Sequence, residues 1–159
     1  MAADGFLKLD GVKGESRDAK HPEEIQILDV QWNLHQQGSM GYGGGGGTGK
    51  VDFHDVSFTK RFDLSSPILM GFCANGKHIK DGLVTIRKAG EHPLEYLKIK
   101  LVDVVVSAST PSGLGSGDGM EHLTLNFSKF HLEYTSQKQD GTKDKSVEFG
   151  WDVNKNEKW

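Results

Sequence analysis

Apolar and polar residues alternate along most of this chain, and a period of two is typical of strands that bury one face. The alternation predicts strands over residues 6–9, 25–35, 51–59, 83–88, 94–107 and 121–134, and a last strand with Val147, Phe149, Trp151 and Val153 on one face. Polar or glycine-rich stretches separate these segments, which is where turns are expected. The pattern therefore predicts a mainly β protein.

The alternation changes face inside three of these segments. The changes fall near Ile27, between Phe53 and Val56, and between Phe127 and Phe130. One extra residue in a strand, a β-bulge, moves all following side chains to the opposite face. Because repeated bulges bend long strands, we predict that the sheet closes into a bent-strand β-barrel.

One segment breaks this pattern and predicts a short α-helix over about residues 66–75. Ser65 and Ser66 can cap its start, Pro67 suits the first helical position, and Asn75 with Gly76 is a typical stop. Four apolar residues recur at helical spacing and are expected to pack on one side of the barrel: Ile68, Leu69, Phe72 and Cys73. We interpret Cys73 as a core residue.

The chain is richest in glycine from residue 41 to residue 49, where seven of nine positions are glycine. Residues 44–50 match the G-x-x-x-x-G-K pattern of a phosphate-binding loop. Such a loop opens a helix, whereas Val51 begins a strand pattern here, so we predict no nucleotide binding. With little side chain to bury in its own core, this glycine arm is expected to contact a neighbouring subunit or ring through Gly43, Gly44, Gly45, Gly46, Gly47, Thr48, Gly49 and Lys50.

Length and charge narrow the class of protein. The 159 residues are predicted to form one domain, 1–159, and 19 basic against 22 acidic residues give a net charge of −3. This balance predicts no nucleic-acid partner, and no apolar stretch is long enough for membrane insertion. The N-terminal residues lack the basic start and apolar stretch of an ordinary secretion signal.

The residue types that carry chemistry are not grouped in the sequence. The seven histidines show no paired ligand spacing, and no G-x-S-x-G nucleophile motif is present. We therefore predict no catalytic residue, no metal and no cofactor. A second long loop is predicted over residues 107–119, and two such loops favour a binding or assembly module.

A series of short motifs runs in order from Val12 to Trp151: VKGES, H-x-E-E-I, GSM, the glycine run ending in GK, SFTK, SPILM, GKH, TIRKAG, EYL, LNF and FGW. Together they resemble the haemolysin-coregulated protein (Hcp) family, the tube subunits of bacterial type VI secretion. The resemblance covers nearly the whole chain, although residues 107–119 and the tail 154–159 match no motif of the family.

This resemblance implies a β-barrel with one helix, hexameric rings of the protein with itself, and stacking of these rings into a tube. It further implies partners in the type VI sheath, the spike and effector proteins carried or chaperoned in the lumen, and no enzymatic activity. The protein would reside in the bacterial cytoplasm before firing and then be secreted, outside or into target cells, without a cleaved signal peptide. From the residues alone, a monomeric secreted β-module that binds carbohydrate or peptide remains an alternative.

The strand over residues 25–35 supplies candidates for the wall of the lumen. After the bulge near Ile27, we expect one set of side chains to face the barrel core: Leu28, Val30, Trp32 and Leu34. The other set is polar and is expected to face either the lumen or bulk solvent: Asp29, Gln31, Asn33 and His35.

Overall fold

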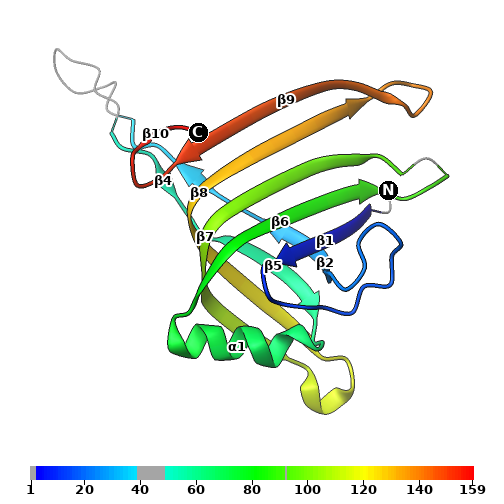
Figure 1. Cartoon of the computed structure of the whole chain (residues 1–159), viewed down its shortest axis with the longest axis vertical. Helices are drawn as coiled ribbons and strands as arrows, with labels where there is room; N and C mark the ends of the chain where they lie inside the picture. The colour runs from blue at the N-terminus through cyan, green and yellow to red at the C-terminus, as the bar shows by residue number, and fades with distance from the viewer. Residues whose placement is uncertain (1–2, 39–48, 92) are drawn as a thin grey trace.

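The computed structural model describes residues 3–38, 49–91 and 93–159 (Figure 1). Over these residues the elements are β1 Ala3–Leu9, β2 Ile25–Gln31, β3 Leu34–His35, β4 Asp52–Phe53, β5 Val56–Arg61, α1 Ser65–Asn75, β6 His78–Lys88, β7 Glu95–Ser112, the 3₁₀ turn η1 Leu114–Ser116, β8 Met120–Gln137, β9 Lys143–Asp152 and β10 Glu157–Lys158. The protein is mainly β, as the alternation predicted.

Six strands close into a barrel. Their order is β8-β5-β2-β1-β6-β7, and β7 pairs again with β8, so the sheet returns to its first strand. All of these pairs are antiparallel. β9 and β10 extend the sheet beyond β8, and β3 and β4 form a small separate sheet. The predicted barrel is confirmed.

The pairing register explains which side chains form the core. Leu7 on β1 lies opposite Ile25 on one side and Val84 on the other, and all three are fully buried. Because each strand alternates in step with its neighbours, such rows run around the inside of the barrel. The core continues through the buried apolar residues Leu9, Ile27, Val56, Phe58, Ile99, Leu101, Leu123, Leu125 and Phe130.

The first predicted bulge lies in β2, and two of its consequences differ from the prediction. Ile27 pairs with Lys60 and Asp29 pairs with Thr59, so Leu28 is the extra residue. Its side chain is 56% exposed, and Leu34 is also exposed. The prediction that Leu28 and Leu34 face the core is therefore wrong, because one occupies the bulge and the other belongs to the small β3–β4 sheet. Val30 and Trp32 do pack against the core.

The second predicted bulge is instead a break between two strands. β4 ends at Phe53 and pairs with β3, whereas β5 begins at Val56 and pairs with β2 and β8. The backbone N–H of His54 donates to the carbonyl of Asn33 at this break. The change of face therefore comes from a change of sheet.

The third change of face is a corner shared by β7 and β8. Val102 pairs with Lys129 and Val104 with Phe127, so the register does not shift. Asp103, between these pairs, has a φ of +55°, a left-handed backbone that breaks the pleat. Buried residues then switch parity on both strands together: Ile99 and Leu101 to Val104 and Val106 on β7, Phe130 to Phe127 and Leu125 on β8. A bend rather than the predicted bulge turns this hairpin around the core.

The predicted helix is confirmed, with differences at its start. It begins at Ser65, so Pro67 occupies the third helical position and not the first. It ends as predicted, because Gly76 takes a left-handed φ of +68° and its N–H donates to the carbonyl of Phe72. Leu69 is fully buried, whereas Ile68 is exposed, so the buried stripe is narrower than predicted. α1 lies at the end of the barrel opposite β4 and β10 (Figure 1).

The predicted loop over residues 107–119 is shorter than expected. β7 and β8 stay paired as far as Ser112 and Met120, and the connection is residues 113–119 with the turn η1. The glycines that flank η1, Gly113 and Gly117, have left-handed φ values of +68° and +86°. The serine- and threonine-rich start of the segment misled the prediction, because these small residues also fit an exposed strand.

Candidate functional site

The four polar residues predicted to line a lumen are all exposed on the outside of the barrel. Register places two of them in rows that cross three strands. Asp29 lies beside Thr59 and His122, and Gln31 lies beside Ser57 and Thr124. The predicted Asn33 and His35 continue this strip beyond the end of β2.

One further strand, β7, widens this polar surface, which the sequence did not reveal. The carboxylate of Asp55 accepts hydrogen bonds from Ser107 Oγ at 2.6 Å and Asn126 Nδ2 at 2.8 Å. Through Asp55, Ser107 joins β7 to the rows that run from β2 to β8. These residues of β2, β5, β8 and β7 form a polar outer surface, in which Asp29 and Asp55 carry charges. We call this surface the polar wall.

The glycine arm can be placed only at its base. Gly43, Gly44, Gly45, Gly46, Gly47 and Thr48 lie outside the described residues. Gly49 and Lys50 are exposed and lead into β4. A Cβ added at Gly49 would lie 3.4 Å from Gln36 Oε1, so Gly49 lies close to the chain that precedes the arm. Figure 1 places β4 at the end of the barrel opposite α1.

The core-facing side of the sheet continues past the closed barrel and becomes exposed. Ile86, Leu97, Tyr134 and Val147 form one row from β6 to β9. Exposure rises along it from 9% at Ile86 to 47% at Tyr134 and 70% at Val147. Phe149 ends the next row and is 40% exposed. We call Tyr134, Val147 and Phe149 the open apolar face.

The edge of β9 is also largely open. β8 pairs with one side of β9 as far as Lys143, whereas β10 covers the other side only at Trp151 and Asp152. Within the described residues, no other strand pairs with this edge. An edge strand beside an apolar face is the kind of surface that folded proteins cover with another chain.

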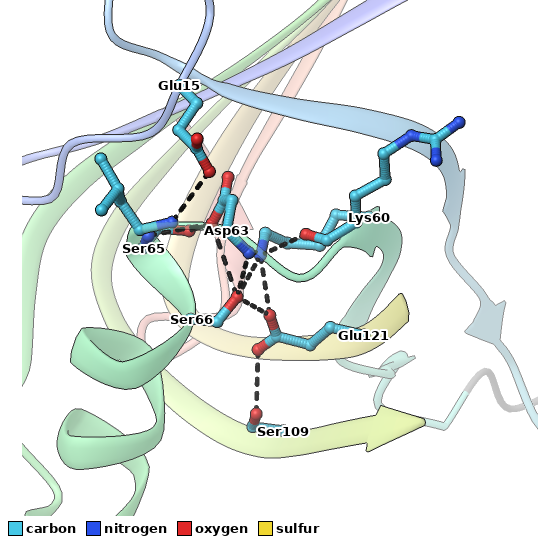
Figure 2. Close-up of polar contacts among 9 residues, drawn as sticks. Glu15, Lys60, Asp63, Ser65, Ser66, Ser109 and Glu121 are labelled. Carbon is cyan, nitrogen blue, oxygen red and sulfur yellow. Dashed lines mark hydrogen bonds and ion pairs between the residues drawn. The ribbon is translucent and has the colours of Figure 1, made fainter. Parts of the chain in front are cut away.

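A buried ion pair holds α1 against the barrel (Figure 2). Lys60 Nζ on β5 lies 2.7 Å from Glu121 Oε2 on β8, and both side chains are fully buried. Ser66 Oγ, in the first turn of α1, donates to the same carboxylate oxygen at 2.6 Å and accepts from Lys60 at 2.9 Å. Ser109 Oγ on β7 donates to Glu121 Oε1 at 2.9 Å. The network therefore joins the helix to three strands.

A sequence signal for this pair existed and was missed. Lys60 has the parity of Val56 and Phe58, and Glu121 has the parity of Leu123 and Leu125. Both charged residues therefore stood at core positions of their strands. Charges at such positions are seldom tolerated unless they are paired.

A cavity of about 710 Å³ lies beside β1, where it is lined by residues of β1, β2 and the loop between them. Arg87 forms one wall and donates hydrogen bonds to Asp18 Oδ2 at 2.6 Å and Asp4 Oδ2 at 3.1 Å. The hydrogen bond from Arg87 holds the pKa of Asp18 well below its usual range, and the bond to Asp18 raises the pKa of Arg87. Both groups therefore keep their charges throughout the neutral range.

The described part of the chain contains neither a grouped set of metal ligands nor an apolar helix of membrane-spanning length. No group of three or more His, Cys, Asp or Glu side chains there is placed to hold a metal ion. No helix among the same residues is long and apolar enough to cross a membrane.

Comparison with known proteins gives matches over nearly the full chain. The family described as "Type VI secretion system effector, Hcp" matches residues 6–134. Protein hcp1 of Pseudomonas aeruginosa is 48% identical over 159 residues, which cover 98% of each protein. Among solved structures, Hcp1 of Salmonella typhimurium has a TM-score of 0.81 and 38% identity over 100% of both chains. Another, described as a type six secretion system protein, has a TM-score of 0.93 and 28% identity over 99% of this chain and 100% of its own.

Proposed function

The chain belongs to the Hcp family of type VI secretion proteins, and we propose that it is the subunit of the inner tube of the secretion machine. Six copies form a closed ring, and rings stack into a tube that the contractile sheath expels with the spike. The role is structural and not enzymatic. The protein acts from the bacterial cytoplasm and leaves the cell with the tube.

The observation that carries this proposal is the open apolar face beside the free edge of β9. Tyr134 and Phe149 are aromatic, and aromatic side chains are enriched in subunit interfaces. A closed ring gives each subunit the same neighbour on that side and leaves no edge free. A monomeric carbohydrate- or peptide-binding module would leave this face in water.

The polar wall supplies the surface expected of a lumen. Gln31, Asn33, Ser57 and Thr59 can hydrogen-bond to many protein surfaces, and their lack of charge imposes no selection for one sign. We propose that this wall faces the channel and contacts effector proteins there. The glycine arm, from Gly43 to Lys50, contacts the next ring in the stack.

The lumen assignment is tested by adding charge to the polar wall without touching the core. Gln31→Glu with Asn33→Asp is expected to leave the ring intact and to reduce the recovery of a co-expressed effector, because a negative wall repels acidic cargo and loses amide donors. Recovery is measured by pull-down and secretion assays. The matched control, Gln36→Glu with Gln37→Asp, changes two exposed amides outside β2. Unchanged recovery with an intact ring places this face outside the lumen.

A further inference from the structure

All three arginines of the chain line the cavity beside β1: Arg17, Arg61 and Arg87. They come from separate segments, which are the loop between β1 and β2, the end of β5 and the end of β6. The other basic residues of the chain are lysines, and within the described residues no lysine lines this cavity. Arginine differs from lysine in binding planar carboxylates through two parallel N–H donors. The grouping therefore indicates a site for an anion.

Arg87 builds one wall of this cavity. It is buried, donates to Asp18 and Asp4, and places its guanidinium carbon 5.1 Å from the ring centroid of Phe6. Because Asp18 belongs to the loop and Asp4 to β1, this arginine ties the loop to the barrel. Its charge is satisfied within the chain, which leaves the other two arginines for a ligand.

The remaining carboxylates of the cavity also have partners within the chain. Asp63 Oδ1 lies 3.1 Å from Lys60 Nζ and accepts from the backbone N–H of Ser65 at 2.9 Å. Glu15 Oε2 accepts from the backbone N–H of Leu64 at 3.1 Å, and Figure 2 shows Glu15 pointing toward the start of α1. This bond links the loop between β1 and β2 to the segment that precedes the helix. Two walls of the cavity therefore hold each other in place.

Arg17 and Arg61 differ from these groups because their charges are not used. Both residues are exposed, and within the part of the chain that the structure describes neither side chain takes part in an ion pair. A guanidinium ion carries several N–H donors and no acceptor. The carboxylate of a ligand supplies both the acceptors and the opposite charge that these two side chains lack.

An apolar surface lies beside the two free arginines. Leu28, the extra residue of the β2 bulge, lines the same cavity and is 56% exposed. Phe62, which follows Arg61 in the chain, lines it as well. A bulge turns a side chain away from the direction that the strand would give it, so Leu28 is presented to a ligand and not to the core. The cavity, of about 710 Å³, is large enough to enclose part of a bound molecule.

The cavity borders the polar wall. On β5, the exposed or half-buried Ser57, Thr59 and Arg61 alternate with buried residues, so all three share the outer face of the strand. On β2, Leu28 directly precedes Asp29, the first residue of the polar wall on that strand. A chain bound in the cavity can therefore continue along the polar wall.

We propose that this cavity anchors effector proteins in the lumen by binding a short segment in which an acidic side chain stands next to an apolar one. The inference rests on the proposed function, which turns the polar wall toward the channel. The acidic side chain binds Arg17 and Arg61, and the apolar one packs on Leu28. Walls held by Arg87 and Glu15 lower the cost of ordering the site on binding. A nucleic acid is disfavoured, because the four carboxylates that line the cavity repel its successive phosphates.

The test uses a short fluorescent peptide of alternating glutamate and leucine, added to the assembled, full-length protein. A matched peptide alternates lysine and leucine. Fluorescence anisotropy is expected to show binding of the acidic peptide that weakens as salt is added, and binding of the basic peptide that is weaker by about tenfold or more. Equal binding of the two peptides, or no binding of the acidic one at millimolar protein, overturns the proposal.

Three variants locate the binding of the acidic peptide. Arg17→Gln with Arg61→Gln is expected to weaken it by about 30-fold and to leave the melting temperature unchanged, because both side chains are exposed. Leu28→Ser is expected to weaken it by about fivefold through loss of the apolar contact. The control, Lys100→Gln, removes an exposed cation of β7 that does not line the cavity and should leave binding unchanged. Unchanged binding in the double arginine variant overturns the proposal.

The mass of the assembly separates this inference from the proposed function. The double arginine variant is expected to form the same ring as the unchanged protein and to recover less of a co-expressed effector. If the double variant dissociates the ring, a second copy of the chain fills the cavity, which overturns the anchoring of effectors and leaves the tube role standing. An unchanged protein that stays at 17.5 kDa contradicts both proposals.

Discussion

Lys60→Met is expected to cause the largest loss of stability of any single change considered for this chain. The substitution leaves the fully buried carboxylate of Glu121 without its cation, and breaking a buried pair costs about 3–5 kcal/mol. For a domain of this size the melting temperature is expected to fall by about 6–20 °C. Calorimetry at a fixed protein concentration measures the change, since assembly also raises the melting temperature.

Two control variants identify the cause of this loss. Lys60→Met with Glu121→Leu removes both charges and is expected to recover most of the stability, because apolar residues can replace a buried pair. Lys13→Met breaks an exposed pair with Glu23, 3.4 Å apart, and is expected to change stability by less than about 1 kcal/mol. If Lys60→Met proves as mild as Lys13→Met, the network in Figure 2 does not anchor the helix.

Val147→Asp combined with Phe149→Asp is expected to dissociate the proposed ring and leave a folded barrel. Val147 is mostly exposed in the isolated subunit, whereas Phe149 is partly buried beside Phe130 and Trp151, so the double change is expected to lower the free energy of unfolding without unfolding the barrel. In the ring the two substitutions would place two carboxylates in an apolar contact, which weakens each contact by about 30-fold or more. Sedimentation velocity measures the assembly, and circular dichroism measures the fold.

A change on the other side of the same strand provides the matched control. Glu148 is exposed, lies between the two substituted positions and points to the opposite face of β9. Glu148→Lys is expected to leave the ring assembled. Dissociation by Glu148→Lys, or a ring that survives both acidic substitutions, places the subunit contact elsewhere.

Features that depend on local pattern were predictable from the sequence. The strands followed from alternation, and the end of α1 followed from Gly76, whose left-handed backbone carries no steric penalty. The barrel followed from the changes of face, although only the one at Leu28 is a bulge in the predicted segment. A bend at Asp103 gives the same parity pattern as an inserted residue, so sequence cannot separate the two.

Features that depend on register between distant strands were not predictable. The polar wall requires Gln31 on β2 to lie beside Ser57 on β5 and Thr124 on β8, and alternation alone does not fix such partners. The same limit applies to Arg17, Arg61 and Arg87, which are far apart in the chain and line one cavity. The apolar pattern of β9 predicted a strand with one buried face, whereas Val147 is exposed in the single chain. A strand patterned for burial but left exposed is expected where the cover is another subunit.

The most direct test of the proposed function is the mass of the purified assembly by native mass spectrometry. We expect a species of six times the 17.5 kDa subunit mass, and electron microscopy of the same sample should show rings with an open centre. Stacks of rings at higher concentration agree with this account. A single species at 17.5 kDa, at micromolar concentration and low salt, contradicts the proposal that this chain is a tube subunit.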